Sequence, residues 1–281
     1  MTLSSALKNG INILEENGVE NAEFDALCLF ESCFGLKKQD ILRSPQEAAD
    51  SRKSELFLSF LQRRIKKEPL QYIIREWDFF GLRLKVGPGV LIPRPETETL
   101  ASLTLQRLEN VACPVIFDLC AGTGCVGLAV AAKRPDAEVY LLEKNAEALY
   151  YLNKNVHNLA FPDTKVLEYD IFGGFPANLP CPGAIISNPP YIPSNELESL
   201  QAEVRAEPKT ALDGGADGMD FYRCFAGKWF LNLKENGFFA VECDPGQTAA
   251  LTKLFNGAGF MCETEKDLFG FDRFIVGDKK I

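Results

Sequence analysis

Residues 115–131 read VIFDLCAGTGCVGLAVA. The stretch begins with an apolar run of strand length, broken by one carboxylate at Asp118. It continues through Gly122, Gly124 and Gly127 into a second apolar run. An apolar strand that passes through a glycine turn directly into a helix is typical of α/β proteins with a parallel sheet. The stretch therefore predicts the first strand, turn and helix of such a sheet.

The same alternation of strand and helix continues to the end of the chain. We expect strands at 115–119, 138–142, 165–169, 184–187 and 238–241, and helices at 124–133, 145–158, 219–235 and 246–258. A final pair at 260–264 and 273–276 is expected to form an antiparallel edge. Alternating strands and helices predict a mostly parallel sheet with helices on both faces. Such sheets bind their ligands at the carboxyl ends of the strands.

The first 75 residues have a different pattern. Apolar residues recur at helical spacing, as at Leu58, Leu61 and Ile65, and Pro69 ends this segment. Residues 76–92 alternate between apolar and polar side chains and contain several glycines, which favours a β-hairpin. We therefore expect a helical bundle over 1–75, a hairpin linker over 76–92 and an α/β domain over 93–281. The residues leave open whether the bundle recognises a partner.

Composition restricts the class of protein. Of the 281 residues, 46% are hydrophobic and 25% are charged, a balance typical of soluble globular proteins. The N-terminus does not resemble a signal peptide and no apolar stretch has membrane-spanning length, so we expect a cytoplasmic protein without membrane contact. The net charge of −9 disfavours direct binding to nucleic acid. Nine cysteines without a CxxC pair predict reduced thiols and no metal site.

Two kinds of nucleotide ligand are compatible with the glycine turn. The GxGxxG spacing, with Glu143 about 20 residues further on, matches the fingerprint of dinucleotide sites. Asp118 lies before the loop, however, and a carboxylate there suits a ligand with an ammonium and a sulfonium better than a pyrophosphate. Glu143 can also accept hydrogen bonds from two ribose hydroxyls. These residues favour S-adenosylmethionine and leave a nicotinamide dinucleotide as the alternative.

A second motif follows the predicted strand at 184–187. Residues 185–193 read IISNPPYIP, in which the Asn188 side chain and the Pro189 backbone each present a carbonyl acceptor. Prolines have no N–H, so no donor competes at this turn. Two acceptors can hold both hydrogens of a planar nitrogen group and draw its lone pair out of conjugation, while the Tyr191 ring covers it. We therefore expect Asn188, Pro189 and Tyr191 to be catalytic residues for methyl transfer to nitrogen.

Together these motifs resemble the class I S-adenosylmethionine-dependent methyltransferases that carry an (N/D/S)PP(Y/F) motif. The similarity extends to PLQYIIREWDFFGLRLKVGPGVLIPRPETETL at 69–100, EVRAEPKTALDGGADGMDFYR at 203–223 and DLFGFDRFIVG at 267–277. These segments narrow the resemblance to the HemK/PrmC family. The NPPY motif alone is also compatible with adenine-N6 methyltransferases of nucleic acids, and the RPETE and ALDGGADG segments favour the HemK/PrmC family instead.

The resemblance implies a fold, a reaction and a set of site residues. The implied fold is a Rossmann-like, mostly parallel seven-stranded sheet behind an N-terminal helical bundle. The implied reaction methylates N5 of the glutamine in the GGQ motif of peptide chain release factors 1 and 2, which the bundle would recognise, and yields S-adenosyl-L-homocysteine. The residues implied to bind the cofactor are Asp118, Cys120, Ala121, Gly122, Thr123, Gly124, Glu143, Ile171 and Asn188. Those implied to form the glutamine pocket are Asn188, Pro189, Pro190 and Tyr191.

Some positions depart from the family pattern or have a simpler explanation. VECDPGQ at 241–247 differs from the usual glycine-rich segment, so Cys243 and Asp244 receive no role. The first 60 residues carry little recognisable similarity. In RPETE, Pro95, Glu96 and Glu98 are all favourable at the start of a helix, and we expect this segment both to begin a helix and to line the pocket. A non-catalytic scaffold remains a further alternative to the enzyme.

Overall fold

The computed structural model describes residues 1–161 and 163–279 and divides the chain into two compact units. The first unit comprises Met1–Glu76 together with Gln201–Ala206, and the second comprises Trp77–Leu200 and Glu207–Ile281. No helix in the described parts of the chain combines the length and the apolar character needed to cross a membrane.

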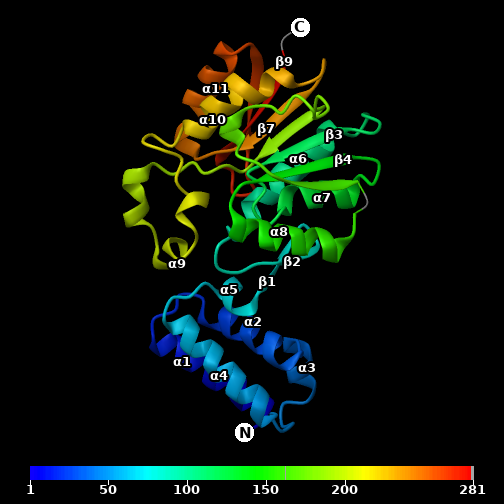
Figure 1. The fold of residues 1–281 in the computed structure, drawn as a ribbon. Coiled ribbons are helices and arrows are strands. Elements are labelled where there is room, and N and C mark those ends of the chain that lie inside the picture. Colours follow the sequence, from blue (N-terminus) through cyan, green and yellow to red (C-terminus); the bar gives the residue numbers. More distant parts are fainter. Residues whose placement is uncertain (162, 280–281) are drawn as a thin grey trace. The chain divides into compact units, whose positions relative to one another are not determined.

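The first unit is a bundle of helices, and its residues 1–76 are drawn in blue to cyan in Figure 1. Its helices are α1 (Leu3–Glu16), α2 (Ala22–Phe34), α3 (Lys38–Arg43), α4 (Ser51–Ile65), α5 (Leu70–Ile74) and the short α9 (Ala202–Arg205). A capping box at Thr2 begins α1, and Gly35, with φ 71°, ends α2. The buried rings of Phe30, Phe34 and Phe57 pack together in the core.

The expected apolar face of α4 is partly wrong. Leu61 is buried, but Leu58 is 39% exposed and Phe57 takes the inward position. Phe57 packs edge-on against Phe30 with ring centroids 5.3 Å apart, and an aromatic ring buries more apolar area than a leucine side chain. On the same helix, Arg64 pairs with the buried Asp25 at 2.6 Å and with Glu203 of α9 at 3.0 Å.

The second unit begins with a hairpin and continues into one large sheet. Strands β1 (Glu76–Phe79) and β2 (Leu82–Lys85) form a two-stranded sheet. The large sheet contains β3 (Val115–Leu119), β4 (Glu138–Glu143), β5 (Thr164–Glu168), β6 (Ala184–Ser187), β7 (Phe238–Glu242), β8 (Phe260–Lys266) and β9 (Asp272–Lys279). Its order is β5-β4-β3-β6-β7-β9-β8. The first five strands are parallel and β9 is antiparallel to β7 and β8, so the expected mostly parallel seven-stranded sheet is confirmed.

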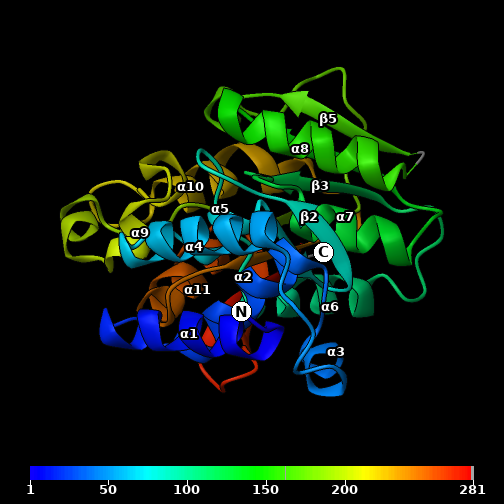
Figure 2. The same cartoon turned by 90° about the horizontal axis from the view of Figure 1, so that it is seen from below.

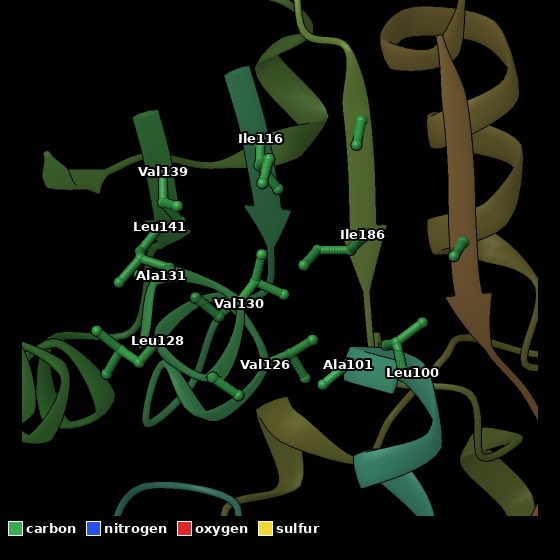
Figure 3. Packing of buried hydrophobic residues seen from close by; sticks show 14 of the residues in the cluster. Leu100, Ala101, Ile116, Val126, Leu128, Val130, Ala131, Val139, Leu141 and Ile186 are labelled. Atoms are coloured by element: carbon green, nitrogen blue, oxygen red, sulfur yellow. The ribbon is translucent and has the colours of Figure 1, made fainter. Parts of the chain in front are cut away.

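Helices cover both faces of this sheet. Helices α6 (Glu98–Arg107), α7 (Cys125–Lys133) and α8 (Ala146–Leu159) pack on one face. Helices α10 (Asp220–Cys224) and α11 (Thr248–Gly257) pack on the other. Figure 3 shows Leu100 and Ala101 of α6 and Val126 of α7 on the side to which Ile116 and Ile186 point. In Figure 2, α8 lies along β5 at the edge of the sheet.

The strand sequences explain this two-sided core. Alternate residues of a strand point to opposite faces, and in β7 Phe238 and Ala240 face α6 while Phe239 and Val241 face α11. Because both faces are covered, the central strands β3, β6 and β7 are buried along their whole length. Their sequences are accordingly apolar runs, interrupted by polar residues such as Asp118.

One expected helix is interrupted. The segment 219–235 is not a continuous α-helix: α10 ends at Cys224, Phe225–Trp229 forms a π-helical turn, and Phe230–Asn232 forms a 3-10 turn. The changes in helical pitch bury Phe225, Trp229 and Phe230 against the sheet. The Trp229 indole N–H also donates to the backbone oxygen of Ile171 at 2.8 Å. Local periodicity does not indicate such a change, because tertiary packing causes it.

Candidate active site

A cavity of about 200 Å³ lies at the carboxyl ends of the parallel strands, within the second unit. Its lining comes mainly from the loops after β3, β4, β5 and β6 and from the segment before α6, with further residues at 208–211 and at Phe221. Strands β3 and β6 are neighbours, although the chain passes through β4 and β5 between them. The cavity therefore occupies the point where the strand order reverses, which is where open α/β sheets bind ligands.

Most of the residues predicted to bind a cofactor lie together in this cavity. Its lining includes Asp118, Cys120, Ala121, Gly122, Thr123, Glu143, Ile171 and Asn188, together with Pro190 from the predicted glutamine pocket. Gly124 is not part of the lining. It forms the N-cap of α7, and its N–H donates to the backbone oxygen of Ala121 at 2.7 Å. Pro189 and Tyr191 are likewise absent from the lining.

Glu143, the last residue of β4, is held by three backbone donors. Oε2 accepts from the N–H of Gly122 at 3.0 Å, and Oε1 accepts from the N–H groups of Lys144 and Asn145 at 2.8 Å each. These contacts join the glycine turn to the end of β4 and hold the carboxylate at the cavity wall. A carboxylate has about four lone-pair positions, so one position is left for a ligand hydroxyl.

Asp118 is buried with 2% of its surface exposed, and Oδ2 accepts from the Gly127 N–H in the first turn of α7 at 2.8 Å. Burial raises the pKa of Asp118 to about 7, although the hydrogen bond from Gly127 opposes this shift. A nearby cation would favour its charged form. The geometry is thus compatible with the predicted contact to an ammonium or sulfonium ligand.

Apolar side chains also line the cavity. Ile171 is buried at the start of a 3-10 turn after β5, and its backbone oxygen is occupied by the Trp229 indole. Phe172 and Phe221, whose rings meet edge to face at 5.1 Å, also line the cavity. A lining that contains both apolar side chains and carboxylates fits a nucleoside with a charged tail, because such a ligand has an apolar base and several polar groups.

The NPPY turn is braced by the glycine-rich segment at 212–218. The Ile192 N–H donates to Leu212, and the Gly214 N–H donates back to Ile192 at 2.8 Å. At Gly218, with φ 74°, a Cβ atom would lie 2.3 Å from the Tyr191 backbone oxygen, so only glycine permits this approach. Tyr191 itself is partly buried and packs against the core on the α10 and α11 side of the sheet. The ALDGGADG segment therefore fixes the position of the NPPY turn.

The half-buried Asn188 side chain begins a chain of hydrogen bonds that continues through two buried residues. Its Nδ2 donates to Thr97 Oγ1 at 3.1 Å, and the Thr97 hydroxyl donates to Glu242 Oε2 at 2.7 Å. Thr97 is 1% exposed and Glu242 is 2% exposed. Asn188 and Thr97 both line the cavity, whereas Glu242 lies behind them.

A second buried carboxylate holds the segment before α6. Glu207, 4% exposed, accepts hydrogen bonds from the Ile92 N–H at 2.9 Å and from the Arg94 guanidinium. Arg94 lines the cavity and Pro95–Thr97 forms a 3-10 turn that leads into α6. The expectation that RPETE begins a helix and lines the pocket is confirmed for Arg94 and Thr97.

Glu207 and Glu242 were not recognised from the sequence as parts of the site, and Thr97 was expected only within the pocket-lining RPETE segment, not as a partner of Asn188. A signal for Glu242 existed: it directly follows the strand expected at 238–241, and the carboxyl ends of parallel strands share the ligand-binding edge. Thr97 and Glu207 carry no such signal, because their partners are distant in the chain.

Other residue types contribute little at this location. His157 is exposed near the end of α8. Cys120 and Cys125 line the cavity, and burial raises the pKa of Cys125 to about 12, so this thiol is protonated at neutral pH. Within residues 1–161 and 163–279, no three His, Cys, Asp or Glu side chains are grouped as ligands of a metal ion would be.

The chain matches two known domain families and several curated proteins. Residues 5–74 match the PrmC N-terminal domain and residues 94–215 match the methyltransferase small domain. The release factor glutamine methyltransferase of Thermodesulfovibrio yellowstonii is 37% identical over 236 residues, 82% of this chain and 83% of the relative. That of Geobacter sulfurreducens is 35% identical over 266 residues, 94% of this chain and 92% of the relative.

The fold also has counterparts among solved structures. A methyltransferase from Pyrococcus furiosus superposes with a TM-score of 0.52 at 16% identity, over 83% of this chain and all of that one. At this identity the likeness concerns the fold alone. The two relatives are 37% and 35% identical to this chain over most of its length and of theirs. This chain therefore belongs to the family of release factor glutamine methyltransferases.

Proposed function

We propose that this chain transfers a methyl group from S-adenosylmethionine to N5 of the glutamine in the GGQ motif of peptide chain release factors 1 and 2. The observation that carries the proposal is that Asn188 shares one cavity with Glu143 and Asp118. Family membership supports the substrate class. Release factors act in translation, so the proposed location of the enzyme is the cytoplasm.

The cavity residues suit the proposed cofactor. Glu143 would accept a ribose hydroxyl, Asp118 would interact with the charged tail, and Ile171 would pack against the adenine. Cys120, Ala121, Gly122 and Thr123 would line the cofactor. S-adenosylmethionine supplies an electrophilic methyl group on a sulfonium. The buried and partly apolar wall would keep water from this group.

Asn188, Pro189, Pro190 and Tyr191 would hold the substrate glutamine. The Asn188 side-chain oxygen and the Pro189 backbone oxygen would accept the two hydrogens of the glutamine amide and localise its lone pair on nitrogen. These acceptors would hold the nitrogen toward the methyl group that S-adenosylmethionine supplies when bound; S-adenosylhomocysteine would be the leaving group, and the proton lost from the nitrogen would pass to solvent. Because the acceptors are held in place before the reaction, they stabilise the charge that develops on nitrogen without further reorganisation.

The first unit is proposed to recognise the release factor. Two features support this role: its match to the PrmC N-terminal domain, and the inclusion of Gln201–Ala206, which immediately precedes the segment at 207–218 that braces the site. A GGQ loop can extend into a narrow pocket because glycines leave its backbone free of side chains.

The test is to incubate the protein with labelled S-adenosylmethionine and purified release factor, and to map the methylated residue. We expect one methyl group on the GGQ glutamine and none on duplex DNA, which is the substrate of the adenine-N6 alternative. The Asn188→Ala variant should lose about 10²–10³-fold in kcat while its affinity for S-adenosylhomocysteine is retained.

A matched control is Asn153→Ala, because Asn153 is an exposed asparagine on α8 that does not line the cavity. This variant should keep the activity of the wild type. Full activity of Asn188→Ala on release factor would exclude the proposed role of the NPPY turn. Methylation of DNA instead of the release factor would exclude the proposed substrate.

A further inference from the structure

Glu242 is a buried carboxylate that does not line the cavity. Its place follows from the sheet: β6 and β7 are parallel with Ser187 opposite Val241, so Asn188 and Glu242 each follow one residue later at the same level. Alternation along β7 turns Glu242 to the face on which α6 packs, and Thr97 immediately precedes that helix. The fold thus brings Glu242, Thr97 and Asn188 into one line.

The three groups form a chain with a defined direction. An ionised carboxylate only accepts hydrogen bonds, and a threonine hydroxyl has a single hydrogen. When Glu242 is ionised, Thr97 must give that hydrogen to Glu242 and can only accept from Asn188. In the structure Asn188 Nδ2 lies 3.1 Å from Thr97 Oγ1, and Thr97 Oγ1 lies 2.7 Å from Glu242 Oε2, which is the placement that this order requires. The amide nitrogen of Asn188 is therefore turned toward Thr97, and its oxygen remains as the acceptor.

The opposite orientation of the Asn188 amide would hinder the proposed reaction. If the Asn188 amide were turned around, it would present an NH₂ group where the proposed reaction requires an acceptor. The two orientations of an amide have nearly the same shape, so only a hydrogen-bond partner can favour one of them. A buried, acceptor-only group behind Thr97 removes this ambiguity.

We propose that Glu242, acting through Thr97, is a positioning residue that holds the Asn188 amide with its oxygen toward the substrate. This inference deepens the proposed function and rests on it for the identity of the substrate. The geometry of the chain of hydrogen bonds, however, can be tested without any substrate.

Protonation of Glu242 would remove the fixed donor-to-acceptor order of this hydrogen-bond chain. A neutral carboxyl can donate to Thr97, and Thr97 can then donate to the Asn188 oxygen. Burial raises the pKa of Glu242 to about 7, and the hydrogen bond from Thr97 opposes this shift. The charged and titratable groups that act on Glu242 come from several segments: Arg94, Glu96, Cys125, Tyr191, Tyr222, Cys243 and Arg273. The orientation of Asn188 is therefore expected to change with pH near neutrality.

Kinetics with release factor provide the first test. Thr97→Val keeps the shape of the side chain but removes the hydroxyl, and should lower kcat about 10- to 100-fold through loss of alignment. The KM for release factor should change no more than ~2-fold, because ground-state binding is largely retained. Thr97→Ser, which keeps the hydroxyl, should recover most of the activity. The kcat of Glu242→Gln should lie between those of Thr97→Val and Thr97→Ser, because an amide can accept from or donate to Thr97.

The matched control is Thr104→Val. Thr104 is a fully buried threonine on α6, and its hydroxyl donates to the Leu100 backbone oxygen instead of to the site. Binding of S-adenosylhomocysteine by each variant shows that it is folded. The proposal is wrong if Thr97→Val keeps the wild-type kcat, if Thr97→Ser is impaired as strongly as Thr97→Val, or if Thr104→Val loses as much kcat.

A second measurement needs no release factor. In ¹⁵N spectra of the full chain, the Asn188 side-chain amide signal, identified by its absence in Asn188→Ala, should titrate near pH 7. The titration should disappear in Glu242→Gln and Thr97→Val. A signal that does not titrate, or that titrates equally in Glu242→Gln, overturns the proposal. If the titration is observed but wild-type protein does not methylate release factor, the proposed function fails and the positioning role stands.

Discussion

At the scale of single residues, the site depends on polar groups whose hydrogen-bond capacity is nearly used up. Glu143 illustrates this: three backbone N–H groups already occupy its oxygens. We expected it to accept from both ribose hydroxyls, but about four lone-pair positions leave room for one. To bind Glu143, the second hydroxyl would have to replace one of these backbone donors. Oε1 accepts from two of them, and Oε2 accepts only from the Gly122 N–H in the glycine turn.

A pH dependence of stability follows from Glu242. Its pKa in the folded protein, about 7, is higher than the ordinary value of 4.5, so the folded state holds the proton more tightly than the unfolded state. The resulting stabilisation is complete below about pH 4.5 and is lost as the pH rises through 7. Glu242→Gln does not titrate. Its free energy of unfolding relative to wild type should therefore rise by ~2–3 kcal/mol between pH 5 and pH 8.

Urea unfolding of both proteins across this pH range measures the difference. Asp118 has a raised pKa of the same kind, but it is present in both proteins and cancels in the comparison. A difference that stays constant, or that falls with pH, would contradict the assignment of Glu242 as a buried carboxyl group with a raised pKa.

At the scale of secondary-structure elements, close approaches between segments position the site and the bundle. The NPPY turn is held by main-chain hydrogen bonds from the segment at 212–214 and by the contact at Gly218. In the first unit, α1 and α4 meet at Gly10, where a Cβ atom would lie 2.5 Å from the ring of Phe57. Both contacts require a residue without a side chain.

Gly10→Ala should therefore destabilise the bundle. Alanine in a helix interior is normally favoured over glycine by about 1 kcal/mol, but here the added methyl group overlaps a fully buried aromatic ring. We expect a net loss of about 1–3 kcal/mol, measured as increased hydrogen–deuterium exchange in α1 and α4. Gly257→Ala is the control, because that glycine ends α11 with no atom near its Cβ position. Unchanged exchange in Gly10→Ala would show that Phe57 moves aside without cost.

At the scale of the whole molecule, ligand binding separates the proposed enzyme from the alternative oxidoreductase. A ligand that binds only the folded protein at 100 times its Kd stabilises it by about 2.7 kcal/mol. S-adenosylhomocysteine at that concentration should raise the Tm of the second unit by about 5–10 °C. NAD should leave the Tm unchanged.

Two further measurements locate this effect. Exchange protection should increase around the glycine turn and the end of β4, which line the cavity, and not in the first unit, which contributes no lining residue. Glu143→Ala should reduce the thermal shift. Stabilisation by NAD and not by S-adenosylhomocysteine would restore the dinucleotide interpretation of the GxGxxG spacing.

Much of this protein could be predicted from the order of its residues alone. Strand and helix periods are local properties of the chain, and they located the five parallel strands and the final antiparallel pair. The glycine turn, Glu143 and the NPPY motif could be assigned to one edge because the carboxyl ends of parallel strands share an edge. The cavity lining agrees for Asp118, Glu143, Ile171 and Asn188.

The remaining features depend on contacts between residues far apart in the chain. The Thr97 hydroxyl contacts Asn188, 91 residues later, and Glu242, 145 residues later. The buried position of Phe57 and the π-helical turn at Phe225–Trp229 likewise follow from the surfaces against which those segments pack. Periodicity reports which face of an element is apolar, but hydrogen-bond direction and close packing depend on which partner lies opposite. That partner is determined only when the strands are aligned in register.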